Sequence, residues 1–325
     1  MGGSVSFFSE LASIDDVEQF AAFAQEKNLP LIIIGGGSNV IFPDRGVLEA
    51  CVGRMRIRGF EILYQNNTHT TIKVGAGEVW DEVVARTVAL GLSGIEALSS
   101  IPGSAGATPI QNVGAYGQDI SQTLVDLEAY DRVEGRVVTI PASDCGFSYR
   151  DSRFKHEWKD RFIILSLTLL LDKKAPSVPA YPGVGAYFEA KQIKNPSLGE
   201  IREGIIEIRK KKLPDPRVVA SCGSFFKNPI IMQEQAMLIK KEFPGAVLYP
   251  MQGGMVKVAA GWMIEQLGFK GKIFGGIEVY PHNALVLVNR GAATRDELDL
   301  AVLKITEEVT KAFNVELELE VVRIS

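Results

Sequence analysis

Residues 95–118 form one long segment, IEALSSIPGSAGATPIQNVGAYGQ, in which small residues alternate with hydroxyl and amide side chains. Glycine lets a backbone adopt left-handed turns and approach a ligand closely, and consecutive N–H groups in such turns form anion sites. Gln111 and Asn112 supply both donors and acceptors, which suits the edge of a heteroaromatic ring. Because a loop of this length is usually functional or disordered, the segment predicts a ligand-binding loop. The alternative is a plain glycine-rich surface loop.

A second glycine-rich turn lies upstream. Residues 31–34, LIII, form a short apolar run that predicts a buried strand, and the run opens into GGGSN at 35–39. This turn is not a P-loop, because no Gly-Lys-Ser/Thr follows it. It is not a Rossmann fingerprint either, because Val40 stands where a fingerprint starting at Gly35 requires glycine. It is therefore a phosphate cradle of another type, or only a tight turn.

The composition excludes several classes of protein. The chain has 325 residues, which predicts two or three domains, and its net charge is −4. The densest basic cluster, at 209–212, is too small for a nucleic-acid surface and fits a single anionic group of a small substrate. Three cysteines and three histidines show no metal or disulfide spacing, so we expect reduced thiols and no metal.

Neither a signal peptide nor a membrane anchor is indicated. The first ten residues, MGGSVSFFSE, lack the basic and apolar regions of a signal peptide. The longest apolar run, at 162–171, is about half the ~20 residues that a membrane-spanning helix needs. We therefore expect a cytoplasmic protein with no membrane partner.

Hydrophobic periodicity predicts a mixed chain of helices and strands. Capping boxes mark two helix starts, at Ser13 with Asp16 and at Thr294 with Glu297. Prolines at 214 and 216 must end a helix, and we place a domain boundary there. Expected helices cover about 14–24, 80–88, 201–208, 256–267 and 294–312. Expected strands cover about 31–34, 47–52, 71–74, 124–130, 136–140, 163–171, 284–288 and 315–324.

Seven motifs occur in one order along nearly the whole chain: GGGSNV, IPGSAGATPIQNVGAYG, FSYRDSRFK, RKKKLPDP, SCGSFFKNP, AGWMIEQLGFKG and LELEV. Together they closely resemble the UDP-N-acetylenolpyruvoylglucosamine reductase family. The resemblance implies an α+β chain with the two-subdomain FAD-binding fold of the vanillyl-alcohol-oxidase (PCMH) type, followed by a C-terminal α+β substrate domain. The expected boundaries are 1–57 and 58–213 for the FAD-binding subdomains and 214–314 for the substrate domain. The terminal strand, about 315–325, is free to return to the FAD-binding half.

The resemblance also implies an activity. A member of this family uses NADPH and FAD to reduce UDP-N-acetylglucosamine enolpyruvate to UDP-N-acetylmuramate in peptidoglycan precursor synthesis. We expect this small molecule, and no nucleic acid, as the partner of a monomeric chain. Two alternatives stay open: another flavin-dependent oxidoreductase of the same fold, and a flavin- or nucleotide-binding protein without catalysis. The chain departs from the family at its start, where MGGSVSFF replaces an Asn-Thr-containing segment that helps to hold the flavin.

Three residues match the family's catalytic positions. Ser224 matches the proton donor, Arg150 the arginine that stabilises the enolate, and Glu320 the catalytic glutamate. Taken without the resemblance, each has a plainer interpretation. Ser224 is then a turn serine, Arg150 a surface arginine paired with Asp151, and Glu320 one member of a solvated face of alternating glutamates. Cys222 is the rival nucleophile, but no step needs covalent catalysis and no nearby histidine could activate it.

The resemblance implies binding residues as well. Tyr181 is the candidate for a loop tyrosine that closes over the substrate, and Tyr187 is the alternative. Other expected substrate contacts are Tyr116, Arg209, Lys212, Asn228 and Gln266. Expected FAD contacts are Gly35, Gly36, Gly37, Ser38, Asn39, Gly103, Ser104, Gln111, Asn112 and Gly114.

Overall fold

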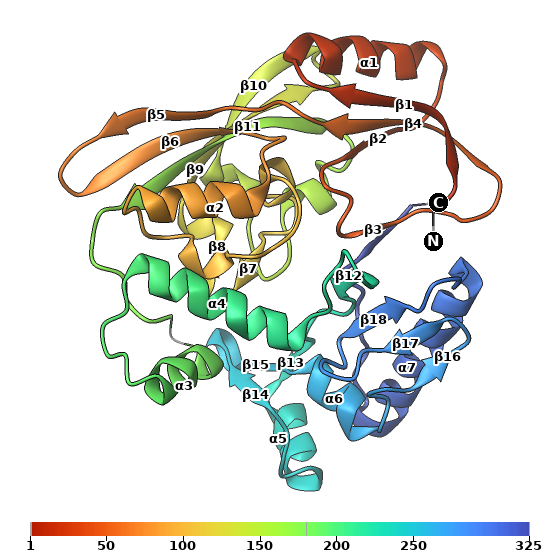
Figure 1. Cartoon of the computed structure of the whole chain (residues 1–325). Coiled ribbons are helices and arrows are strands. Elements are labelled where there is room, and N and C mark those ends of the chain that lie inside the picture. Colours follow the sequence, from red (N-terminus) through yellow and green to blue (C-terminus); the bar gives the residue numbers. More distant parts are fainter. Residues whose placement is uncertain (1, 180, 325) are drawn as a thin grey trace. The chain divides into compact units, whose positions relative to one another are not determined.

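The computed structural model describes residues 2–179 and 181–324, and the chain divides into two compact units (Figure 1). The larger unit contains Val5–Gly37 and Val47–Arg209, and the smaller unit contains Met1–Ser4, Ser38–Gly46 and Lys210–Ser325. The change of unit at Arg209 lies four residues before the expected boundary at 213. Both expected FAD-binding subdomains fall mainly in the larger unit, and their division at residue 58 stays a prediction.

The first sheet of the larger unit has the strand order β1-β4-β2, and its β2 and β4 are parallel. Figure 1 shows α1 lying along this sheet. The predicted capping box of α1 is confirmed, with Ser13 accepting from the Asp16 N–H and the Asp16 carboxylate accepting from the Ser13 N–H. The bounds are β1 Ser4–Leu11, α1 Ile14–Glu26, β2 Leu31–Ile34 and β4 Val47–Met55.

The second sheet of the larger unit is antiparallel, with the strand order β10-β9-β11-β6-β5. Helix α2 buries Trp80, Val83 and Val84 in the same hydrophobic core as this sheet. The predicted strands near 71, 124, 136 and 163 and the helix near 80 are confirmed. The bounds are β5 Phe60–Gln65, β6 His69–Gly75, α2 Trp80–Ala89, β9 Leu124–Asp131, β10 Arg136–Pro141 and β11 Phe162–Asp172.

A buried carboxylate fixes the β9–β10 turn. Asp131 is 1% exposed and accepts hydrogen bonds from Arg161, the shortest at 2.6 Å, and from the backbone N–H groups of Val133 and Glu134. The Arg161 hydrogen bond is the largest cause that holds the pKa of Asp131 below its ordinary value of 3.8, against an opposing effect of burial. A carboxylate with a lowered pKa in the folded state stabilises the fold above its unfolded pKa, and this contribution is lost as the pH falls.

We therefore expect Asp131→Asn to lower the melting temperature at about pH 7 by several degrees, on the order of 2–8 °C. The difference from the wild type should shrink as the pH falls below 3.8 toward the lowered pKa of the folded state. Melting curves over this pH range check the prediction, with Glu61→Gln on the exposed strand β5 as the control. A pH-independent difference would contradict it.

Two helices complete the larger unit, where α3 packs on α4 through Val184 and Phe188 against Ile201, Ile205 and Ile208. A side chain at Gly204 would meet the Tyr187 ring at 2.8 Å, so glycine permits this close helix contact. The predicted end of α4 before Pro214 is confirmed, since the helix stops at Lys212. The bounds are α3 Pro182–Ala190 and α4 Leu198–Lys212.

The smaller unit contains two antiparallel sheets, ordered β12-β18-β17-β16 and β13-β15-β14, and one parallel pair, β3 with β19. Helices α6 and α7 share its core. The bounds are β3 Val40–Ile41, β12 Ala220–Ser224, β13 Ile230–Met232, α5 Gln233–Glu242, β14 Leu248–Pro250, β15 Met255–Val258, α6 Ala260–Gln266, β16 Ile273–Phe274, β17 Ile277–Val279, β18 Val286–Asn289, α7 Arg295–Phe313 and β19 Val322–Arg323.

Two expected elements of the smaller unit were wrong in extent. The helix expected over 256–267 begins only at Ala260, because the alternating sequence MVKV before it forms strand β15. The strand expected over 315–324 is reduced to β19, preceded by one isolated bridge between Leu319 and Phe226. The capping box of α7 is confirmed at Thr294 and Glu297.

Candidate functional site

Two expected FAD loops meet inside the larger unit. A Cβ atom placed on Gly36 would lie 3.1 Å from Gly103 Cα, and one on Gly35 would lie 2.0 Å from the Ser104 hydroxyl. Glycine therefore permits the close approach of the GGG turn to the long glycine-rich segment. Gly37 has φ +72°, a left-handed conformation that also favours glycine. This backbone-to-backbone contact is what a single nucleotide cradle built from both loops requires.

The long segment contains short regular elements and is hydrogen-bonded to residues 76 and 78 upstream of it. It contains short 3-10 turns at Glu96–Leu98 and Ala105–Ala107 and a small hairpin of β7 (Gly114–Ala115) with β8 (Gln118–Asp119). The amides of Ala105 and Gly106 donate to backbone carbonyls at 2.9 Å, so they are engaged within the protein. The plain surface-loop interpretation does not fit residues such as Leu98 and Ala105, which are fully buried.

Two expected cofactor contacts also have structural tasks. Asn112, 5% exposed, donates its side-chain amide to the Ser148 carbonyl at 3.0 Å and accepts from the Ser121 N–H at 3.2 Å. Gly114 lies in β7, where a Cβ would approach Asp119 Cβ at 2.7 Å. The amide of Asn112 thus makes two hydrogen bonds that hold the segment to neighbouring parts of the protein.

Three expected substrate residues lie together in the larger unit. The rings of Tyr116 and Tyr181 pack edge to face, with centroids 5.3 Å apart. Burial is the largest cause that raises the pKa of Tyr116, and the nearby positive charge of Arg209 acts in the opposite direction. Tyr187, the alternative to Tyr181, instead packs against Phe188 and lies under the ammonium of Lys191.

Residues that sequence reasoning missed hold Arg209. Its Nε donates to the Ser100 carbonyl at 3.2 Å, and the N–H of Ser100 donates to the Asp81 carboxylate. Asp81 also accepts two hydrogen bonds from Arg202, at 2.6 and 3.0 Å. Burial is the largest cause that lowers the pKa of Arg209, and the positive charge of Arg150 acts in the same direction. The two arginines are thus near enough to form a concentrated positive field for an anion.

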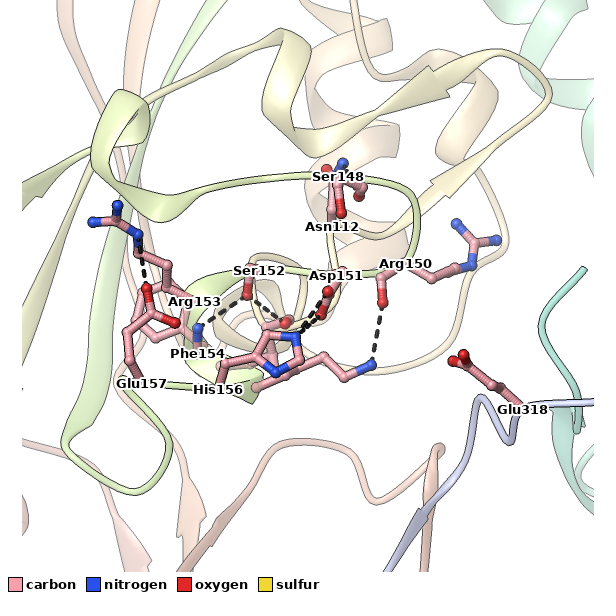
Figure 2. A network of polar contacts seen from close by, with 12 residues as sticks. Asn112, Ser148, Arg150, Asp151, Ser152, Arg153, Phe154, His156, Glu157 and Glu318 are labelled. Atoms are coloured by element: carbon pink, nitrogen blue, oxygen red, sulfur yellow. Dashed lines mark hydrogen bonds and ion pairs between the residues drawn. The ribbon is translucent and has the colours of Figure 1, made fainter. Parts of the chain in front are cut away.

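Arg150 occupies a tight turn. Its φ is +56°, in the left-handed region that arginine rarely adopts. Ser148 and Asp151 on either side exchange backbone hydrogen bonds at 3.1 and 3.3 Å. The Asp151 carboxylate accepts from His156 Nε2 at 2.8 Å, and Figure 2 shows the Arg150 guanidinium extending away from this pair. The plainer interpretation paired Arg150 with Asp151, but the structure pairs the Asp151 carboxylate with His156 instead.

Ser224 lies at a β-bulge in the smaller unit. Between Ser221 and Ser224, strand β12 has one more residue than its partner β18. Gly223, at φ +70°, supplies the left-handed residue that such a bulge requires. A bulge changes the direction in which a side chain points. Gly223 therefore allows the bulge that sets the direction of the Ser224 side chain.

The expected catalytic residues Ser224 and Glu320 lie on neighbouring segments of the smaller unit. The N–H of Glu320 donates to the Phe225 carbonyl at 2.9 Å, directly after Ser224. The side chain of Asn39, an expected FAD contact, donates to the Glu320 carbonyl at 3.1 Å. The alternation predicted from LELEV is present, since Val315 and Leu317 are buried.

The remaining expected contacts of the smaller unit are distributed over its helix ends. Asn228 accepts a hydrogen bond from the Ala260 N–H at 2.9 Å and so holds the first turn of α6. Gln266 is the last residue of α6, and Lys212 is the last residue of α4. Ser38 precedes β3 in the loop that carries Asn39.

The surroundings of the three thiols disfavour the reactive thiolate form. Burial raises the pKa of Cys145 to about 11 and also raises the pKa values of Cys51 and Cys222. A protonated thiol reacts slowly, and Cys51 and Cys145 are also buried, whereas Cys222 is half-buried. We expect the native protein at about pH 8 to react with a thiol reagent at least about ten times more slowly than the unfolded chain.

We also expect Cys222→Ser to keep near-wild-type turnover. A loss of about 10²-fold would contradict the expectation that no step needs a nucleophilic thiol.

Residues 2–179 and 181–324 contain neither a metal-binding cluster nor a membrane-spanning helix. No group of three histidine, cysteine, aspartate or glutamate side chains in these ranges could hold a metal ion. None of the helices in the same ranges is long and apolar enough to span a bilayer.

Known proteins match this chain over almost its full length. A family model described as FAD binding domain matches residues 6–141, and one described as UDP-N-acetylenolpyruvoylglucosamine reductase, C-terminal domain, matches residues 215–324. The reductase of that name from Pseudomonas syringae pv. syringae is 40% identical over 313 residues, 96% of this chain and 91% of the relative. The one from Pseudomonas aeruginosa is 41% identical over 305 residues, 94% of this chain and 89% of the relative.

A solved structure agrees in fold. The crystal structure of UDP-N-acetylenolpyruvylglucosamine reductase from Thermus caldophilus superposes with a TM-score of 0.66 at 21% identity, covering 97% of this chain and 91% of that one. The expected FAD-binding fold with a C-terminal substrate domain is thereby confirmed. The chain belongs to the UDP-N-acetylenolpyruvoylglucosamine reductase family.

Proposed function

We propose that this chain reduces UDP-N-acetylglucosamine enolpyruvate to UDP-N-acetylmuramate, with FAD as cofactor and NADPH as hydride donor. The observation that carries the proposal is the 40% identity to a reductase of that name over 96% of the chain. The chemistry of bound FAD is hydride transfer, from NADPH to the enolpyruvyl double bond.

The residues of both glycine loops fit a cofactor with a pyrophosphate. The contact between Gly36 and Gly103 joins the two loops into one stretch of backbone. Backbone N–H groups of such turns bind phosphate oxygens. We assign the FAD contacts to both loops, with Asn112 and Gly114 acting through the backbone. The set is Gly35, Gly36, Gly37, Ser38, Asn39, Gly103, Ser104, Gln111, Asn112 and Gly114.

The reaction requires two groups from the protein: a cation at the substrate carboxylate and an acid at the α-carbon. Hydride arriving at the terminal carbon of the enolpyruvyl group pushes negative charge onto the α-carbon and its carboxylate. Arg150 is proposed to bind that carboxylate, because a planar guanidinium can contact both oxygens. Ser224 is proposed to protonate the α-carbon, because a fixed hydroxyl can serve as acid toward so basic a partner. Glu320 is the third proposed catalytic residue.

The substrate contacts follow the clusters described above. Tyr116, Tyr181 and Arg209 form one proposed subsite, and the pairing of Tyr181 with Tyr116 favours Tyr181 over Tyr187 as the closing tyrosine. Lys212, Asn228 and Gln266 complete the proposal, the lysine toward an anionic group and the amides toward sugar or uracil. We further propose a cytoplasmic, monomeric enzyme.

Steady-state turnover tests the function. Purified protein should oxidise NADPH beyond one equivalent per flavin only when the enolpyruvyl nucleotide is added, and mass spectrometry should find a product heavier by two hydrogen atoms. Turnover of another acceptor in place of this nucleotide would favour a different oxidoreductase of the same fold. Flavin binding without any turnover would favour a protein that has lost catalysis.

A further inference from the structure

The turn that carries Arg150 is held in an unfavourable backbone conformation. Its φ of +56° places Arg150 in the left-handed region, between the mutually hydrogen-bonded residues Ser148 and Asp151. A non-glycine residue in this region is strained and persists only where its surroundings enforce it. Groups outside the turn must therefore keep it in place.

Two buried side chains attach the turn to the long glycine-rich segment. Asn112 donates from that segment to the Ser148 carbonyl at 3.0 Å, just before the turn. Ser152 donates back from just after the turn to the Ile110 carbonyl at 2.6 Å. Their exposed fractions are 5% and 1%. Figure 2 shows Asn112 beside Ser148, with Ser152 on the other side of the turn.

The hydrogen bonds around Ser152 form a connected set. Its hydroxyl also accepts from the Phe154 N–H at 3.3 Å, which starts the following 3-10 turn. Lys155, in that turn, donates its ammonium to the Arg150 carbonyl at 3.1 Å. Ser152 therefore connects the Ile110 carbonyl to the 3-10 turn that contains Lys155, and Lys155 in turn donates to the carbonyl of the strained residue Arg150.

We propose that Ser152 is a positioning residue for Arg150: together with Asn112 it latches the Arg150 turn to the glycine-rich segment. The placement of the guanidinium is then set by the same segment that is assigned to the cofactor. This inference rests on the proposed role of Arg150. A displacement of about 1 Å in a group that orients a substrate can cost about 10²-fold in rate. Loss of a buried hydroxyl that fixes the turn is therefore expected to act on the step that needs Arg150.

The test uses Ser152→Ala in the FAD-loaded full chain. We expect reduction by NADPH to stay within about threefold of the wild type and reoxidation by the enolpyruvyl nucleotide to slow about 10-fold to 100-fold. Ser166→Ala is the matched control. Ser166, in β11, is also a buried serine (6% exposed), and its hydroxyl donates to the carboxylate of Glu128 in β9 at 2.9 Å. It should change neither rate by more than about threefold.

A double-mutant comparison separates positioning from general destabilisation. In the Arg150→Ala background, Ser152→Ala should have little further effect on reoxidation, because the group it positions is gone. Amide hydrogen exchange gives a readout that does not depend on turnover. Exchange of the peptide covering 147–154 should be at least about tenfold faster in Ser152→Ala than in the wild type and in Ser166→Ala.

Asn112→Asp tests the other half of the latch. It keeps the oxygen that accepts from Ser121 and removes the donor to Ser148, so it should also slow reoxidation and speed exchange of this peptide. Unchanged exchange and reoxidation in both variants would overturn the latch, and so would an equal slowing by Ser152→Ala with and without Arg150. If the wild type does not turn over the enolpyruvyl nucleotide, the proposed function fails, while the exchange measurement still decides the latch.

Discussion

Ser224→Ala is expected to leave reduction of the bound flavin by NADPH nearly unchanged and to slow its reoxidation by the enolpyruvyl nucleotide by at least about 10²-fold. The size is that of a positioned proton donor. The structural reason is the bulge at Gly223, where β12 gains one residue before Ser224. Hydride from NADPH requires no proton from this residue, so only the second half-reaction should suffer. Rapid-mixing measurements of the flavin absorbance separate the two halves.

Ser221→Ala is the matched control for this prediction. Ser221 lies in the same strand, pairs with Val288 in β18, and would undergo the same chemical change without altering the bulge. It should keep both half-reactions near the wild-type rates. A Ser224→Ala enzyme that loses both half-reactions equally, or neither, would remove Ser224 from the role of proton donor.

Gly36→Val is expected to weaken FAD binding by at least about tenfold. Already the Cβ atom would lie 3.1 Å from Gly103 Cα, and the two methyl groups of valine would force the two glycine loops apart. Overpacking of this kind typically costs about 1–3 kcal/mol, and here it would act on the backbone that is assigned to the pyrophosphate. The flavin-to-protein absorbance ratio after gel filtration, and titration of the apoprotein with FAD, measure the loss.

Gly135→Asn serves as the control for the loop variant. Gly135 has φ +64° in the turn between β9 and β10, and a Cβ there would meet nothing within 4 Å. Asparagine tolerates this left-handed conformation, so FAD content should stay at the wild-type value. Retention of full FAD affinity by Gly36→Val would show that the contact between the two loops is not part of the cofactor site.

The sequence predicted those parts of the fold that carry a local signal. Capping boxes located the starts of α1 and α7, and apolar periodicity located β9, β11 and α2. Strand β5 was missed because five of its six residues are exposed, so its sequence has no alternation of buried and exposed positions. Helix α5 was missed because only Ala236 and Ile239 of it are buried. Elements with so few buried residues have no periodic pattern of apolar residues in their sequence.

The motifs assign residues to the candidate site, and these assignments stay predictions, but the motifs do not indicate the side chains that hold those residues in place. The motifs supplied Arg150, Tyr116 and Arg209, but nothing local reveals that Asp81 holds Arg202, 121 residues further along the chain. The left-handed backbone of Arg150 was equally hidden, because arginine has no preference for it. Tertiary hydrogen bonds impose both features, and single-sequence patterns contain no information on such contacts.

The proposed function is tested most simply by the visible spectrum of the purified protein under anaerobic conditions. We expect an oxidised flavin band that NADPH bleaches and that the enolpyruvyl nucleotide then restores, with one equivalent of reduced product formed. A colourless protein that does not take up FAD would contradict it. So would a bleached flavin that the enolpyruvyl nucleotide leaves reduced.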